Sequence, residues 1–226
     1  MHHLDRRQKL YLILAGFFIT NAIVAEMIGG KLIQVGPFVM SIGVVPWPIV
    51  LIATDIINEY FGKEGVKRLT FITVGLIAYT FLVLFAAMGI PAASFSPVQN
   101  EQFSAVFGQS MWIIFGSIIA FMASQFIDVM VFWFFRTKTR GKMLWLRATG
   151  STAISQAMDS LAIIGIAFWL PSKVKTEEFF NVAFTNYSYK LIIAVAITPL
   201  IYLAHYLIDR YLEGEVSADA DAKPVA

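Results

Sequence analysis

Long apolar segments constrain this chain more than any other feature of its sequence. Six of them follow one another between residues 10 and 208. A helix needs about 20 mostly apolar residues to cross the roughly 30 Å hydrocarbon core of a bilayer. With 58% hydrophobic and 14% charged residues, the composition is not that of a soluble domain. The sequence therefore predicts an all-α, polytopic integral membrane protein that is embedded in a lipid bilayer.

Six spans are predicted, and the second is irregular. The expected spans are residues 10–28, 48–61, 69–89, 111–135, 150–170 and 189–208. The second reaches only about 21 Å, so residues 38–47 must also enter the membrane. Pro46 and Pro48 interrupt this stretch, which predicts an element broken near the two prolines and ended by Gly62. The chain then divides into an N-terminus (residues 1–9), a six-helix domain (10–211) and a disordered tail (212–226).

The basic residues predict the orientation of the chain. All 17 lysines and arginines except Lys31, Lys173, Lys175 and Lys190 lie near the two termini or in the loops after the second and fourth spans. Cytoplasmic loops of membrane proteins carry such an excess of basic residues. Six spans place both termini on one side of the membrane, so both are expected to be cytoplasmic.

A polar motif occurs twice inside the apolar segments. Ser124-Gln-Phe-Ile-Asp128 recurs as Ser155-Gln-Ala-Met-Asp159. Because Gln and Asp are three residues apart in each copy, a helix places them on one face. An ionisable side chain in hydrocarbon is costly and usually faces the bundle interior or a cavity. The repeat therefore predicts two helices that turn their polar faces toward a common interior.

A third polar stretch joins this set. Asp55, Asn58 and Glu59 share one helix face. Counted from the predicted cytoplasmic ends, Asp55, Asp128 and Asp159 all lie about 9 to 13 Å into the membrane, and no Lys or Arg is expected deep in a span. We therefore expect these acids to line one cavity without basic partners. The candidate binding residues are Asp55, Asn58, Glu59, Gln125, Asp128, Gln156 and Asp159.

Structural alternatives remain for these residues. Amides and carboxyls inside a membrane also form hydrogen bonds between packed helices without binding any ligand. Glu59 stands four residues before Lys63, which is the spacing of a surface ion pair on a helix. For Glu59 the ion pair and a functional role are equally supported.

Motifs for catalysis and metal binding are missing from the sequence. There is no cysteine, and the three histidines are His2, His3 and His205. This excludes disulfides and thiolate chemistry and leaves no histidine pair at metal-ligand spacing. No nucleophile elbow or glycine-rich phosphate loop occurs. We therefore predict no catalytic residue, no metal and no cofactor, and we interpret the basic loops as topology signals and anionic-lipid contacts, not as nucleic-acid sites.

Four motifs together resemble a known family. They are Thr54-Asp-Ile-Ile-Asn-Glu-Tyr-Phe-Gly62, Ser124-Gln-Phe-Ile-Asp-Val129, Trp145-Leu-Arg147 and Ser151-Thr-Ala-Ile-Ser-Gln-Ala-Met-Asp159. As a set, in this order and spacing, they resemble the bacterial queuosine precursor transporters of the vitamin uptake transporter family. The resemblance implies a multi-pass inner-membrane importer of 7-cyano-7-deazaguanine and/or 7-aminomethyl-7-deazaguanine, which supply queuosine in tRNA.

The chemistry of such a deazapurine suits the polar set. Its ring N–H and exocyclic amine lie side by side, so one carboxylate accepts both, and its carbonyl and nitrile suit the amides of Gln125, Gln156 and Asn58. One alternative is a substrate-binding subunit of an energy-coupling-factor transporter. Such subunits dock through an Ala-x-x-x-Ala face on the first helix, a spacing that Ala15, Ala22 and Ala25 do not provide. A membrane-embedded enzyme or an assembly factor with structural acids is the other alternative, and homo-oligomer formation is left open.

Overall fold

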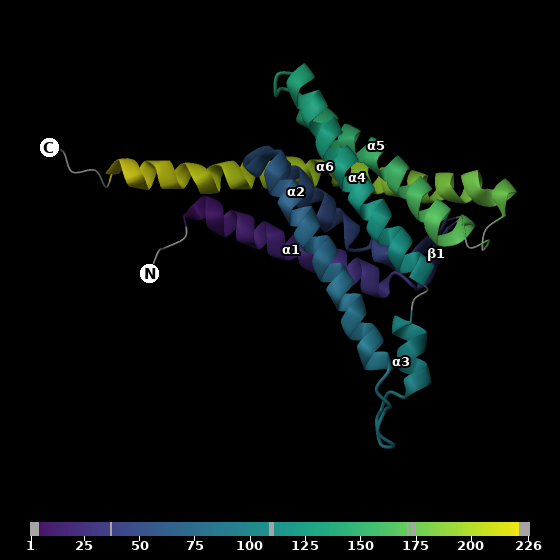
Figure 1. Cartoon of the computed structure of the whole chain (residues 1–226). Coiled ribbons are helices and arrows are strands. Elements are labelled where there is room, and N and C mark those ends of the chain that lie inside the picture. Colours follow the sequence, from purple (N-terminus) through teal and green to yellow (C-terminus); the bar gives the residue numbers. More distant parts are fainter. Residues whose placement is uncertain (1–4, 37, 109–110, 171, 173–174, 222–226) are drawn as a thin grey trace.

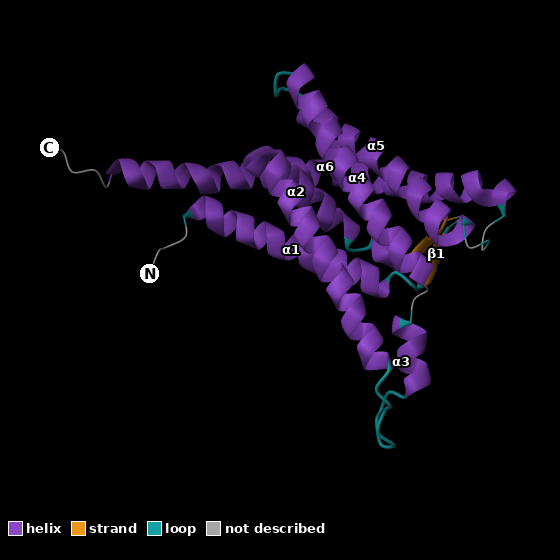
Figure 2. Cartoon of the chain, in the orientation of Figure 1, coloured by secondary structure: helices purple, strands orange, loops and turns teal. Residues whose placement is uncertain are grey.

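The computed structural model describes residues 5–36, 38–108, 111–170, 172 and 175–221, and helices dominate it (Figures 1 and 2). The helices are α1 (Arg6–Ile28), α2 (Trp47–Met88), α3 (Asn100–Phe107), α4 (Met111–Lys138), α5 (Leu144–Ile163), the π-helix η2 (Ile164–Trp169) and α6 (Thr176–Asp221). The prediction of a helical protein is confirmed, with one small addition. Strands β1 (Leu32–Val35) and β2 (Phe38–Ser41) form an antiparallel hairpin, followed by the short 3₁₀ helix η1 (Ile42–Val44).

The hairpin lies between the first and second predicted spans, and its second strand falls in residues 38–47, which were expected to enter the membrane. Leu32 pairs with Ser41 in its register, and the 3₁₀ turn that follows packs against the end of α1. A Cβ atom at Gly43 would lie 2.6 Å from the carbonyl oxygen of Ala25, so only glycine fits there. Helix α2 then begins at Trp47, with Pro46 as its N-cap and Pro48 in its first turn. The two prolines thus stand at the start of a helix that follows non-helical chain.

Helix α2 contains both the second and the third predicted span. Its helical geometry is interrupted at Gly62, as the sequence predicts, where φ is 74° and ψ is −177°. Only glycine adopts this backbone conformation readily. Figure 1 shows the sharp change of direction that results. Among the described residues, five helices are long and apolar enough to cross a membrane, and the bent stretch Ile42–Met88 counts as one of them.

The helices pack as pairs around a buried core. Helices α4 and α5 form an antiparallel pair, α1 lies along α2, and α6 crosses α5 and α2 (Figure 1). Phe18, Val50, Ile57 and Phe121 are fully or almost fully buried where α1, α2 and α4 meet. Large apolar side chains cover the outer surface, including Leu12, Phe17, Leu82, Phe134 and Leu203. An apolar outer surface suits the hydrocarbon core of a bilayer.

Helix α6 extends beyond the predicted sixth span at both ends. It continues to Asp221, whereas we expected the chain after residue 211 to be disordered. Alanine and glutamate in this stretch favour helix, so propensity permits the continuation. Residues 222–226 of the predicted tail lie outside the described residues.

Candidate functional site

Helix α5 turns a row of small polar side chains toward α4. Ser151, Thr152, Ser155 and Gln156 are all at most 7% exposed. Because α4 and α5 are antiparallel, this row meets Asp128, which accepts hydrogen bonds from Ser155 Oγ at 3.1 Å and Thr152 Oγ1 at 3.5 Å. The predicted inward orientation of both Gln-x-x-Asp faces is therefore observed.

Next to this row lies a group of buried polar atoms that lack hydrogen-bond partners. Asp55 is 1% exposed and Asn58 is not exposed at all. Within the described part of the chain, neither carboxylate oxygen of Asp55, neither amide atom of Asn58, nor Oε1 of Gln125 has a partner. The side chains of Asp128, Glu59 and Arg147 are close enough to interact electrostatically with the Asp55 carboxylate. Leaving a buried polar group without a hydrogen bond costs about 1–3 kcal/mol. These side chains therefore lower the stability of the protein, which favours a functional role for them.

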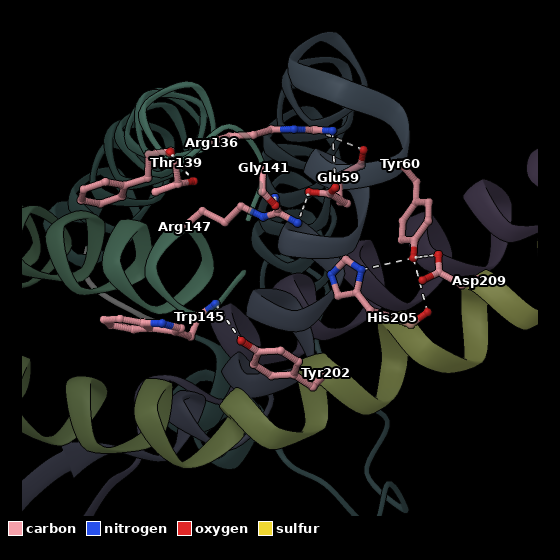
Figure 3. A network of polar contacts seen from close by, with 11 residues as sticks. Glu59, Tyr60, Arg136, Thr139, Gly141, Trp145, Arg147, Tyr202, His205 and Asp209 are labelled. Carbon is pink, nitrogen blue, oxygen red and sulfur yellow. Dashed lines mark hydrogen bonds and ion pairs between the residues drawn. The ribbon is translucent and has the colours of Figure 1, made fainter. Parts of the chain in front are cut away.

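Glu59 lies at the Gly62 end of the bundle and is held by two arginines (Figure 3). Its Oε2 is 3.0 Å from Nη2 of Arg147, and its Oε1 is 3.4 Å from Nη2 of Arg136. Arg147 also donates to the carbonyl oxygen of Gly141 at 2.7 Å. The suggested ion pair with Lys63 is not formed, because the Lys63 ammonium lies over the ring of Trp133 instead.

Tyr60, the residue after Glu59, joins α2 to two further helices. Its hydroxyl donates to Oδ1 of Asp209 at 2.5 Å and lies 3.2 Å from Nδ1 of His205, while its ring stacks on the imidazole (Figure 3). From α1, Arg7 donates to the Tyr60 carbonyl oxygen. We refer to Glu59, Tyr60, Arg136, Arg147, His205 and Asp209 as the Glu59 cluster. It ties α2, α4, α5 and α6 together at one end of the molecule.

Asp159 belongs to a different part of the structure. Its carboxylate forms an ion pair with the ammonium of Lys190 on α6. The expectation that the three acids Asp55, Asp128 and Asp159 have no basic partners is therefore wrong for Asp159. Lys190 lies near the start of the predicted sixth span, but α6 begins at Thr176, which carries Lys190 into the bundle. Arg147 is likewise inside a helix, because α5 begins at Leu144.

Asp159 lines a cavity of about 300 Å³ next to the β-hairpin, which we call the hairpin-end cavity. Its lining comes from α1, the hairpin region, the start of α2, α4, the end of the α5–η2 element and α6. The polar lining residues are Glu26, Ser41, Ser117, Asp159, Asn186 and Lys190, and the aromatic ones are Trp47, Phe121 and Phe168. This mixture suits a small planar ligand with several hydrogen-bonding groups.

The other six predicted residues do not line this cavity, which differs from the single three-acid cavity that we expected. Asp55 and Asp128 are close to each other, but Asp159 is further along the bundle. Measured along its helix, Asp159 is about 22 Å from the start of α5. Asp128 is only about 15 Å from the neighbouring end of α4. The depth estimate placed the start of the fifth span too late.

Sequence reasoning missed several residues of the hairpin-end cavity. Glu26 shares the lining of this cavity with Ser117, Asp159 and Lys190. Its position inside the first apolar segment was a usable signal, because acids are rare there. No comparable signal marks Trp47 or Asn186, which reach the cavity only through the packing of α2 and α6.

The acids and histidines of the described chain are spread along the bundle. No three His, Cys, Asp or Glu side chains in that part come together as metal ligands. What the arrangement provides is a polar cavity at one end, unpartnered polar groups in the middle and ion pairs at the other end.

Most of this chain is similar in sequence to known proteins. The sequence profile of the family described as "Putative vitamin uptake transporter" matches residues 41–204. The chain is 26% identical over 180 residues to the "Probable queuosine precursor transporter" of Bacillus subtilis (strain 168), covering 79% of this chain and 77% of that protein. It is 28% identical over 169 residues to the "Queuosine precursor transporter" of Escherichia coli (strain K12), covering 68% of this chain and 66% of that protein. It is 25% identical over 158 residues to the "Probable queuosine precursor transporter" of Haemophilus influenzae (strain ATCC 51907 / DSM 11121 / KW20 / Rd), covering 68% of this chain and 63% of that protein. No solved structure matches.

Proposed function

Because this chain belongs to the vitamin uptake transporter family, we propose that it imports queuosine precursors across the bacterial inner membrane. The relatives reported above are named queuosine precursor transporters. The cargo is 7-cyano-7-deazaguanine and/or 7-aminomethyl-7-deazaguanine, used afterwards to modify tRNA. No catalytic step is part of this proposal.

The observation that carries the proposal is the order of three polar regions along the bundle. On α2, the cavity residue Trp47 is followed by Asp55 and Asn58, and then by Glu59. On α4, the cavity residue Ser117 is followed by Gln125 and Asp128, and then by Arg136. Helix α5 runs in the opposite direction, so its order along the chain is Arg147, Gln156 and then the cavity residue Asp159. Polar side chains at successive levels of an apolar bundle are what an importer of a polar molecule needs.

The hairpin-end cavity is the proposed binding site. Its volume of about 300 Å³ lies at the lower end of the range for small-molecule sites. The rings of Trp47, Phe121 and Phe168 offer faces on which a purine-like plane can stack. Asp55, Asn58, Glu59, Gln125, Asp128 and Gln156 are proposed to contact the substrate later on its route.

The basic residues support an orientation for this route. Arg136 and Arg147 belong to the Glu59 cluster, and Arg7 donates to it from α1. Lys63 stands just beyond the Gly62 bend. By the positive-inside rule this end faces the cytoplasm. We propose that α2 crosses the membrane twice through its bend, which gives six crossings with both termini cytoplasmic. The cavity then faces outward and the Glu59 cluster closes the inner end.

The test is uptake in a bacterial strain that neither makes nor imports queuosine precursors. Expression of this chain is expected to restore queuosine in tRNA when 7-cyano-7-deazaguanine is supplied. The variants Asp128→Asn and Asp159→Asn, present in the membrane at normal levels, are expected to reduce that signal at least tenfold. If the wild-type chain reaches the membrane and no queuosine appears with either precursor, the proposal is wrong. Uptake of labelled precursor with and without a proton gradient then separates proton coupling from facilitated diffusion.

The structure gives little support to the energy-coupling-factor alternative. Ala22 and Ala25 of α1 are 2% and 4% exposed, and the Ala25 carbonyl oxygen packs against Gly43. These alanines therefore pack against other parts of the same chain and are not exposed for docking to another subunit. Co-purification of an ATPase with the tagged chain would favour that alternative.

A further inference from the structure

Two aspartates from different helices lie close together in the middle of the bundle. Asp55 of α2 is 1% exposed and Asp128 of α4 is 3% exposed. The two side chains are close enough for their charges to interact. Two ionised carboxylates repel each other strongly in such a place, because little water is present to screen them. A positive charge at the pair would remove this repulsion.

The residues around the pair leave this charge for a ligand to supply. Within the described chain, neither carboxylate oxygen of Asp55 has a hydrogen-bond partner. Arg147 interacts electrostatically with Asp55, but its guanidinium is 3.0 Å from Glu59 and donates to the carbonyl oxygen of Gly141. Glu59 itself adds a further acidic group near Asp55. Helices α1 and α6 pack apolar residues against this part of α2, namely Phe18, Ala22, Ile197 and Ile201.

The acids toward either end of the bundle differ from this central pair. Glu59 is held by two arginines, and Asp159 is held by Lys190. Among the ion pairs of the described residues, none includes Asp55 or Asp128. A carboxylate that is held by a fixed cation stays ionised, whereas one without such a partner is free to gain and lose a proton.

Unused hydrogen-bond acceptors stand beside the pair. Asn58 follows Asp55 by three residues and Gln125 precedes Asp128 by three, so each amide lies about one turn from an aspartate. The side-chain oxygens of both amides lack partners in the described chain. A protonated carboxyl group is a hydrogen-bond donor, which these oxygens need. A metal ion would require a space lined by about six oxygen ligands, whereas a proton needs no space of its own.

We propose that the Asp55–Asp128 pair binds one exchangeable proton that crosses the membrane with each cargo molecule, an inference that rests on the proposed function. The proton is taken up from the outer side with the cargo and released to the cytoplasm when the cargo leaves. With the proton bound, a hydrogen bond can join the two acids, and without it they repel. The proton therefore changes how α2 and α4 pack, and the proton gradient drives import.

The experiment measures cargo and proton movement together in liposomes that contain the full chain. The cargo is labelled 7-cyano-7-deazaguanine, which is uncharged, and a trapped pH dye reports protons. Wild type is expected to move about one proton per cargo molecule. One pH unit, acidic outside, should then drive up to about tenfold accumulation, because one unit is a tenfold ratio of proton activity. A protonophore should abolish this accumulation.

The variants are compared by the ratio of protons to cargo, which does not depend on how fast each variant works. Asp55→Asn and Asp128→Asn should each lower this ratio from about one to near zero, because either change removes the pair. Asp55→Glu keeps an ionisable group and should keep the ratio. Glu101→Gln, at an exposed position on α3, is the matched control and should also keep it.

A spectroscopic measurement covers the case in which a variant is folded but too slow to give a ratio. Infrared spectra of the chain in lipid nanodiscs at neutral pH detect the C=O stretching band of a protonated carboxyl group. Wild type should show such a band, and Asp55→Asn should lack it. Equal carboxyl bands in the two proteins would overturn the inference.

The possible failures are distinguishable. If wild type moves cargo without protons, or if a sodium gradient drives accumulation in place of a proton gradient, this inference is wrong and the proposed function stands. The same holds if Asp55→Asn keeps a ratio of about one. If folded wild type transports neither precursor, both are wrong.

Discussion

The Glu59 cluster and the hairpin-end cavity use the same chemistry for opposite purposes. Each contains acid–base pairs between helices, Glu59 with Arg136 and Arg147 at one end and Asp159 with Lys190 at the other. In the Glu59 cluster, side chains from four helices fill the space around the carboxylate (Figure 3). Around Asp159, glycines and spaced aromatic rings leave about 300 Å³ unfilled. An ion pair therefore closes a bundle or lines a binding site according to what packs around it.

The largest effect is expected when the cavity pair is broken. Lys190→Met leaves the Asp159 carboxylate inside the bundle without its ammonium, and breaking a buried pair from one side costs about 3–5 kcal/mol. Thermal unfolding in detergent should show a clearly less stable protein, and uptake should be lost. The double variant Asp159→Asn/Lys190→Met should recover most of the stability without recovering uptake.

The control for this prediction is Lys175→Met, at an exposed position before α6. It should unfold like wild type. A stable Lys190→Met protein with normal uptake would show that the pair is not needed at this end.

The Glu59 cluster should behave as a seal. Glu59→Gln weakens the pairs to Arg136 and Arg147, and each hydrogen bond between charged groups is worth about 1.5–3 kcal/mol. The cytoplasmic side should then open more often. Because the chain has no cysteine, Gln125→Cys provides a unique reporter in the middle of the bundle. In inside-out vesicles, a membrane-impermeant maleimide should label this cysteine about tenfold faster when Glu59→Gln is added.

Glu64→Gln is the matched control, because Glu64 is exposed on the same helix just beyond the bend. It should leave the labelling rate of the reporter unchanged. Equal rates with and without Glu59→Gln would mean that the cluster does not close the inner end.

The smallest effect concerns the bend that connects the two regions through α2. Gly62→Ala forces a side chain into a conformation with φ of 74°, at a cost of about 1–3 kcal/mol. Gly75→Ala is the comparison, since Gly75 is helical and a Cβ there meets nothing within 4 Å. It should stabilise the helix by up to about 1 kcal/mol. Thermal unfolding of both variants measures the difference, and equal melting temperatures would show that the bend is not strained by a side chain.

Local signals predicted the elements of this protein well. The apolar segments gave helices, Gly62 interrupts α2, and the Gln-x-x-Asp faces are turned inward. These features depend on residues close together in the chain, through helix periodicity and the backbone freedom of glycine. The two-stranded hairpin was missed because four-residue strands have too little pattern to stand out in an apolar sequence.

The sequence by itself determined that this is a membrane bundle with costly polar groups inside it. Only the tertiary structure decided how those groups are shared. Asp159 meets Lys190 because α5 and α6 pack against each other, and Glu59, three residues before the Gly62 bend of α2, meets Arg147 near the start of α5. Glu26 joins the cavity because α1 ends beside α4. An ion pair or a cavity needs atoms within a few ångströms, and for residues far apart in the chain only the packing of helices sets that distance.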